Sequence, residues 1–167
     1  MRLRSTIILL LAILLSGCVN QYKVVKDTNS AAYIRFERKI ADPILGSITS
    51  YIKVDAEQQC RQAYADQELM ARHNRGNPLV SDLNVDGLYV KPGYFRIRIN
   101  TVAGGANCDV FVGTEIEAGQ KYKVLVEGNV HISVNKCLAK VYKMTGEKEG
   151  KEIYEELIPV EYKQCNF

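Results

Sequence analysis

The sequence predicts a mainly β protein, an antiparallel β-sandwich of about 7–9 strands with one short helical insert near residues 56–75. Apolar and polar residues alternate with a period of two through most of the chain after residue 30, as in strands with one buried face. Turn residues recur about every 8–12 residues, a spacing typical of sandwiches. No repeat or linker divides residues 31–167, so we expect a single domain there.

The first two expected strands show this alternation. In the segment 32–37, two apolar side chains face one side and two charged side chains face the other: Ile34 and Phe36 against Arg35 and Glu37. The segment 48–55 repeats the pattern, with Ile52 and Val54 inward. Each segment is therefore predicted to cover the core with one face.

The helical insert departs from this pattern. Residues 56–75 are rich in Ala, Gln, Glu, Leu and Met, which favour helices. Asp55 is a possible N-cap and Gly76 a stop signal. Cys60 is expected to tie this segment to the rest of the domain.

Turn residues delimit the later strands. Lys91-Pro92-Gly93 is predicted to turn the chain between strands at 88–90 and 94–100. Gly128-Asn129 and a charged segment at 145–150 are predicted turns, and Pro159 indicates a sheet edge or a bulge. The remaining strands are expected at residues 108–112, 122–126, 130–134, 137–141 and 153–162.

The N-terminus has the pattern of an export signal. Arg2 and Arg4 precede an unbroken apolar run from Ile7 to Leu15. This run of nine residues would be about 14 Å long as a helix, whereas a bilayer core needs about 20 residues. We therefore predict that residues 1–17 are a signal peptide.

The end of that segment, Leu15-Ser16-Gly17-Cys18, resembles the lipobox of bacterial lipoproteins. The resemblance implies that diacylglycerol is joined to Cys18, that the chain is cut before it, and that palmitate is attached. Residues 18–30 are then a lipidated tether. Val19 stands where inner-membrane lipoproteins of enteric type have Asp, which favours the periplasmic face of the outer membrane.

The other cysteines are expected to form disulfides, because an even number in an exported chain suggests pairing. Three pairings of the four are possible, and we favour Cys108–Cys137 with Cys60–Cys165, since Cys108 and Cys137 each open a β-like run. Neither Cys-x-x-Cys nor Cys-His metal-site spacing occurs, so no metal site is expected.

The charge balance gives no support to a nucleic-acid partner, so none is expected. The formal net charge is +3, from 22 basic and 19 acidic side chains, and two of the basic ones lie in the expected signal. The rest of the chain is nearly neutral. The partners expected are the membrane, through the lipid on Cys18, and an envelope protein or a cell-wall component.

No catalytic motif is present, so we expect neither an enzyme nor a cofactor. His73 and His131 stand alone and are interpreted as surface residues, His73 on the helix. Glu115 and Glu117 share a face that is interpreted as a solvated edge. Gly104-Gly105 is interpreted as a hairpin tip.

The order of features resembles small bacterial envelope lipoproteins of uncharacterised function that have a transthyretin-like or immunoglobulin-like sandwich. The Pro-Gly turn before a basic strand (91–98) and the Ala-Gly turn at 118–122 carry this resemblance, which covers about residues 31–142. We therefore expect a non-catalytic binding or structural module. The alternatives are a secretion-system assembly lipoprotein, such as a type VI outer-membrane anchor, and a lysozyme-inhibitor-type lipoprotein.

Overall fold

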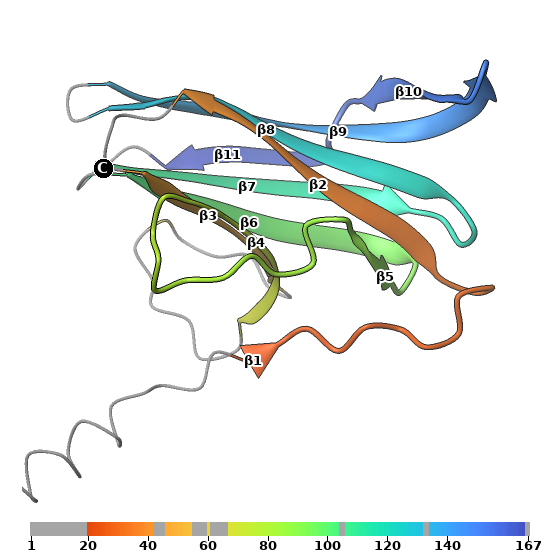
Figure 1. Cartoon of the computed structure of the whole chain (residues 1–167). Coiled ribbons are helices and arrows are strands. Elements are labelled where there is room, and N and C mark those ends of the chain that lie inside the picture. The colour runs from red at the N-terminus through yellow and green to blue at the C-terminus, as the bar shows by residue number, and fades with distance from the viewer. Residues whose placement is uncertain are drawn as a thin grey trace, which may run out of the picture.

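The computed structural model describes residues 20–41, 46–54, 60, 67–103, 106–131 and 134–165. Within these ranges the chain forms two β-sheets that lie one over the other (Figure 1). The strands are β1 (Asn20–Gln21), β2 (Ala32–Ala41), β3 (Ser47–Lys53), β4 (Glu68–Arg75), β5 (Leu88–Val90), β6 (Gly93–Ala103), β7 (Ala106–Ile116), β8 (Lys121–His131), β9 (Val134–Lys148), β10 (Lys151–Leu157) and β11 (Glu161–Cys165). The predicted β-sandwich is confirmed, but the described residues form eleven strands where about 7–9 were expected.

The sandwich is mixed, whereas a wholly antiparallel one was expected. The six-stranded sheet has the order β1-β4-β3-β6-β7-β11, and the five-stranded sheet has the order β10-β9-β8-β2-β5. β2 runs parallel to β8, and β1 runs parallel to β4. Alternation along one strand reports which face is buried but not the direction of its neighbour, so the sequence pattern could not reveal these parallel pairs.

The prediction of a helix near residues 56–75 is wrong for its last part. Residues 68–75 form β4, which pairs with β3, and no helix occurs among the described residues. Met70 and Ala71 are fully buried in the core, and Met70 is the extra residue at a register shift between β3 and β4, so packing outweighs the helix propensity of this segment. Residues 55–59 and 61–66 of the expected insert lie outside the described ranges.

Three of the later boundaries also differ. β8 runs unbroken through Gly128-Asn129, where a turn was expected. β9 extends to Lys148, which shortens the charged turn to Glu149-Gly150, where both residues have positive φ. The expected last strand at 153–162 is two strands, β10 and β11, in different sheets with Pro159 between them. Pro159 therefore lies at a crossing between sheets.

The core lies between the two sheets and is built from the inward residues of each alternating strand. Its largest fully buried side chains include Tyr51, Tyr122, Phe36, Ile34, Met70, Ile97 and Ile99. Burying a side chain of this size contributes about 1.5–3 kcal/mol. The disulfide between Cys108 on β7 and Cys137 on β9 joins the sheets through this core, with its Cα atoms 6.2 Å apart.

No helix in the described ranges is long and apolar enough to cross a membrane. The start of the described chain lies along the sandwich: Asn20 pairs with Glu68 of β4, and the amide of Tyr22 donates to the carbonyl of Leu69 at 3.0 Å. Further on, the amide of Val25 donates to the carbonyl of Tyr89 on β5 at 3.3 Å. Part of the expected tether is thus hydrogen-bonded to the domain.

Candidate functional site

A polar pocket of about 450 Å³ lies on the five-stranded sheet. Its volume is within the range of about 300–1,000 Å³ typical of small-ligand sites. We call it the tyrosine pocket, and its lining consists of three tyrosines and four charged residues: Tyr33, Tyr89, Tyr154, Arg35, Lys121, Asp86 and Glu152. These residues come from β2, β5, β8, β10 and the segment before β5.

The alternation of β2 places its part of the pocket. Ile34 is buried in the core, so Tyr33 and Arg35 on either side of it lie on the outer face. In the sheet register, Tyr33 is opposite Tyr89 on one side and Lys121 on the other. Residues far apart in the sequence therefore form one row across the outer face.

The ring of Tyr33 is held from two directions. It meets the ring of Tyr89 edge-on, with 5.2 Å between ring centres, and its hydroxyl donates to the backbone carbonyl of Asp86. Gly87 permits this arrangement, because a Cβ there would lie 2.7 Å from the Tyr33 hydroxyl and 2.6 Å from the carbonyl oxygen of Ile34. Its φ of 115° also favours glycine.

A bulge in the β9–β10 hairpin shapes the other side of the pocket. Ile153 is opposite Gly146, but Tyr154 is opposite Met144, so Thr145 has no counterpart in the register. An extra residue of this kind bends the strand and increases its twist. Glu152 and Tyr154 from this edge strand then join the residues of β2 and β8 in the pocket lining.

Glu152 connects the two cations of the pocket with Tyr154. It accepts a hydrogen bond from the Tyr154 hydroxyl at 2.7 Å and from Nζ of Lys121 at 3.2 Å, and it lies 3.9 Å from Nη1 of Arg35. The bonds from Tyr154 and then Lys121 lower the pKa of Glu152. Burial, followed by the hydrogen bond to Glu152, raises the pKa of Tyr154 to about 12.

The outer face continues beyond the pocket through Lys123. Its Nζ lies 4.4 Å from the ring centre of Tyr154 and 5.0 Å from that of Tyr142. It also lies 3.7 Å from a carboxylate oxygen of Glu37. Cation–π contacts of this length hold the two rings in place, so the aromatic surface extends past the pocket.

The pocket offers aromatic rings and hydrogen-bonding groups of both kinds. Arg35 and Lys121 donate, Asp86 and Glu152 accept, and tyrosine hydroxyls do both. Among the described residues, no group of three or more His, Cys, Asp or Glu side chains is placed to hold a metal ion. These groups are suited to holding a polar ligand by stacking and hydrogen bonds.

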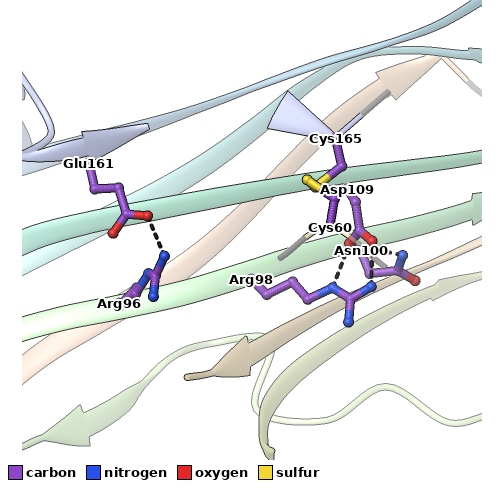
Figure 2. The surroundings of a disulfide bond; sticks show 7 residues. All are labelled: Cys60, Arg96, Arg98, Asn100, Asp109, Glu161 and Cys165. Atoms are coloured by element: carbon purple, nitrogen blue, oxygen red, sulfur yellow. Dashed lines mark hydrogen bonds and ion pairs between the residues drawn. A yellow bond between two sulfur atoms is a disulfide. The ribbon is translucent and has the colours of Figure 1, made fainter. Parts of the chain in front are cut away.

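A second polar cluster lies on the outer side of the six-stranded sheet (Figure 2). Arg98 on β6 pairs with Asp109 on β7 through two hydrogen bonds, and the Nδ2 of Asn100 also donates to Asp109 at 3.1 Å. Asp109 is fully buried. Arg96, which is also buried, pairs with Glu161 of β11 through its Nη2.

This second cluster surrounds a small apolar group. Phe111 and Val54 are buried there together with Cys165, which is bonded to Cys60 with 5.5 Å between Cα atoms. Both Arg96 and Arg98 lie within 6 Å of the Phe111 ring centre, at 5.6 and 5.8 Å. The charges are paired internally and enclosed, so we interpret this cluster as structural.

The cysteines pair as favoured from the sequence, Cys60 with Cys165 and Cys108 with Cys137. The bond to Cys165 joins Cys60, a residue of the expected insert, to the end of β11. Cys18, the expected lipid attachment residue, and the predicted hairpin tip Gly104-Gly105 lie outside the described residues.

His73 was interpreted as a surface residue on a helix, and this is wrong. It lies half-buried on β4, its Nε2 is 3.0 Å from the carbonyl oxygen of Phe36, and its ring meets that of Tyr51 edge-on. His131 ends β8, and its side chain is outside what the structure describes. Glu115 and Glu117 are exposed at the end of β7, and Glu117 pairs with Lys143 at 2.9 Å.

The sequence did not reveal the tyrosine pocket. Alternation placed Arg35 on the outer face, but nothing local indicated that Tyr89 and Lys121 flank the same strand. Glu152 and Tyr154 were missed because the last strand was assigned as one element. The available signal was the count of ten tyrosines, several at outward positions of alternating strands.

No protein-family model matches this chain, and searches of curated proteins and of solved structures find no significant match.

Proposed function

We propose that this chain is a bacterial envelope lipoprotein whose sandwich is a non-catalytic binding module that uses the tyrosine pocket as its site. The observation that carries the proposal is the pocket of about 450 Å³ with three tyrosine rings and four charged side chains on one sheet face. Exposed, pre-positioned aromatic and charged groups of this kind are typical of recognition surfaces.

The pairing of charges in the pocket favours binding over catalysis. Glu152 is tied to Lys121, Arg35 and Tyr154, and its lowered pKa keeps it ionised at neutral pH. A general acid or base instead needs a pKa near the working pH. The pocket lining contains no His, Cys or Ser that could act as a nucleophile beside a base.

The location is proposed from the N-terminal sequence. A lipid on Cys18 would hold the protein at the membrane, with the periplasmic face of the outer membrane favoured by Val19. Only Val19 separates Cys18 from Asn20, the first residue of β1. Two residue steps span at most about 7 Å, so the domain would sit close to the bilayer surface.

Two experiments test this proposal. Cys18→Ala should abolish palmitate labelling and leave an unprocessed precursor, and unchanged labelling would refute the anchor. For the pocket, Tyr89→p-benzoylphenylalanine should form a photo-adduct of higher mass in native membranes. The same probe at Tyr94, an exposed tyrosine of the six-stranded sheet, is the control.

The adduct from position 89 should weaken when Glu152→Gln is added, because Glu152 lines the same pocket. The benzophenone reacts with C–H bonds, so the assay detects a protein and a glycan alike. If positions 89 and 94 give the same adducts, or if position 89 gives none, the pocket is not the binding site.

A further inference from the structure

The tyrosine pocket combines three features that suit a sugar ring. The rings of Tyr33, Tyr89 and Tyr154 offer apolar faces with a polar hydroxyl at one end. Around them stand donors and acceptors, Lys121 and Glu152 among them. A sugar has apolar C–H faces and a rim of hydroxyls that both donate and accept, so it uses both kinds of surface at once.

The charges of the pocket balance one another. Its cations, Arg35 and Lys121, both lie near Glu152, at 3.9 and 3.2 Å, and Asp86 adds a second carboxylate. A phosphate or another anion would meet two carboxylates, and a cation would meet a guanidinium and an ammonium. The electrostatics therefore favour a neutral ligand.

A peptide is a poorer fit at this place. Extended peptides gain affinity from unpaired backbone groups at a sheet edge. The floor of the pocket is β2, which at Tyr33 is paired with β5 on one side and β8 on the other. The backbone of β2 is thus already paired at this position, so a ligand there meets side chains, and the apolar surface that they offer is aromatic.

The binding groups are also held before any ligand arrives. Tyr33 is fixed by its contact with Tyr89 and its bond to the backbone of Asp86, and Tyr154 is fixed by its bond to Glu152 and its contact with Lys123. Side chains that are already ordered lose less entropy on binding. A weakly interacting ligand such as a sugar benefits most from this.

We infer that the tyrosine pocket binds a neutral carbohydrate chain, with sugar faces on the tyrosine rings and hydroxyls bonded to Arg35, Lys121 and Glu152. This rests on the proposed function, because it names the ligand class of the same site.

The test uses the full chain in detergent micelles, with tyrosines labelled at ¹³Cζ. The probes are chitohexaose and maltohexaose, which are neutral, and a heparin hexasaccharide, which is anionic. At least one neutral probe should bind and shift the signals of Tyr33, Tyr89 and Tyr154. Tyr89→Ala should weaken that binding about tenfold, which corresponds to roughly 1.4 kcal/mol. Glu152→Gln, which keeps the side-chain shape, should weaken it as well.

Tyr94→Ala is the matched control, since Tyr94 also bonds a glutamate, Glu161 at 3.0 Å, but lies on the other sheet. It should leave sugar binding unchanged. Binding of heparin alone, no binding of any probe, or equal weakening by Tyr94→Ala would overturn the inference. The photo-adduct from position 89 separates the proposed function from the carbohydrate inference. An adduct with a protein that carries no sugar would support the binding module and overturn the carbohydrate inference. The absence of any adduct would contradict both.

Discussion

The hydroxyl of Tyr154 donates a hydrogen bond of 2.7 Å to Oε2 of Glu152, two residues earlier on β10. The two side chains lie on the same side of the hairpin, next to the bulge at Thr145. This bond links the aromatic part of the tyrosine pocket to its charged part. Substitution of either residue should therefore alter the ionisation of the other.

The first prediction concerns the ionisation of Tyr154. Its pKa is raised from the ordinary value of 10 to about 12, so in the folded state it should stay protonated after exposed tyrosines ionise. Its contribution to stability is present below pH 10 and is lost as the pH rises from 10 to about 12, because the unfolded chain ionises first. Titration of ¹³Cζ-labelled tyrosines, assigned with Tyr154→Phe, measures this pKa.

Glu152→Gln should lower the pKa of Tyr154, because the charged acceptor is removed, but not fully to 10, since burial is the larger cause of the shift. The control is Glu155→Gln, an exposed neighbour on the same strand, which should leave the Tyr154 titration in place. A Tyr154 that ionises near pH 10 in the parent protein would contradict the bond.

The second prediction concerns Gly87. Gly87→Ala should destabilise the fold by about 1–3 kcal/mol, because the added Cβ meets the Tyr33 hydroxyl and the carbonyl of Ile34, in addition to the strain of positive φ. The signals of Tyr33 and Tyr89 should also shift, because the ring of Tyr33 must move. Urea unfolding and the tyrosine spectrum measure the two effects.

Gly93 provides a matched control for Gly87. It has the same φ of 115°, but a Cβ there would meet nothing within 4 Å. Gly93→Ala should therefore show the backbone strain alone and leave the tyrosine pocket unchanged. If both variants lose the same unfolding free energy and have the same tyrosine spectrum, the position of the Tyr33 ring does not require the absence of a Cβ at residue 87.

The third prediction concerns the buried carboxylate of Asp109. Asp109→Ala should lower the free energy of unfolding by about 3–5 kcal/mol, because it removes the acceptor for Arg98 and Asn100 from an enclosed cluster. Glu115→Ala, on the same strand but exposed, should change stability by less than about 0.5 kcal/mol. Urea unfolding of both variants measures this difference, and a cost for Asp109→Ala below 1 kcal/mol would argue against the pair.

The fourth prediction compares the two disulfides. Cys60 and Cys165 are 105 residues apart, and Cys108 and Cys137 are 29 apart. In the chain-entropy relation these loops correspond to contributions to stability of about 4.8 and about 3.6 kcal/mol. The double variant Cys60→Ala/Cys165→Ala should therefore be less stable than Cys108→Ala/Cys137→Ala, as far as chain entropy decides. Cys137 and Cys108 lie in the main core, where their loss also costs packing. Each double variant retains one bridge, and the unfolding free energy that the variant loses on reduction measures the contribution of that bridge. A smaller loss for the 105-residue bridge than for the 29-residue bridge would contradict the prediction.

The sequence predicted the sandwich because burial alternates along strands such as β2 and β6. Each inward residue there, such as Ile34 or Ile97, is buried by the opposite sheet. It failed at β4, where helix-forming residues are held in a strand by the burial of Met70 and Ala71. Helix propensity is weaker than such packing, and the packing of these residues becomes known only from the fold.

The candidate site was harder to predict than the fold. The seven residues of the tyrosine pocket come from five segments that meet only through sheet register, as in the row of Tyr89, Tyr33 and Lys121. A parallel pair such as β2 and β8 leaves no turn between its strands that could suggest the contact. The disulfide pairing was accessible because few cysteines leave few combinations.

The Cys60–Cys165 bond makes the chain from residue 60 to residue 165 a closed loop, and the described part of that loop includes β4 to β11. A protease that cuts once within this loop therefore opens the ring without releasing a fragment. The two pieces would run together on a denaturing gel and separate only after reduction. Whatever holds the N-terminus in place would thus keep both pieces of a nicked domain at the same site.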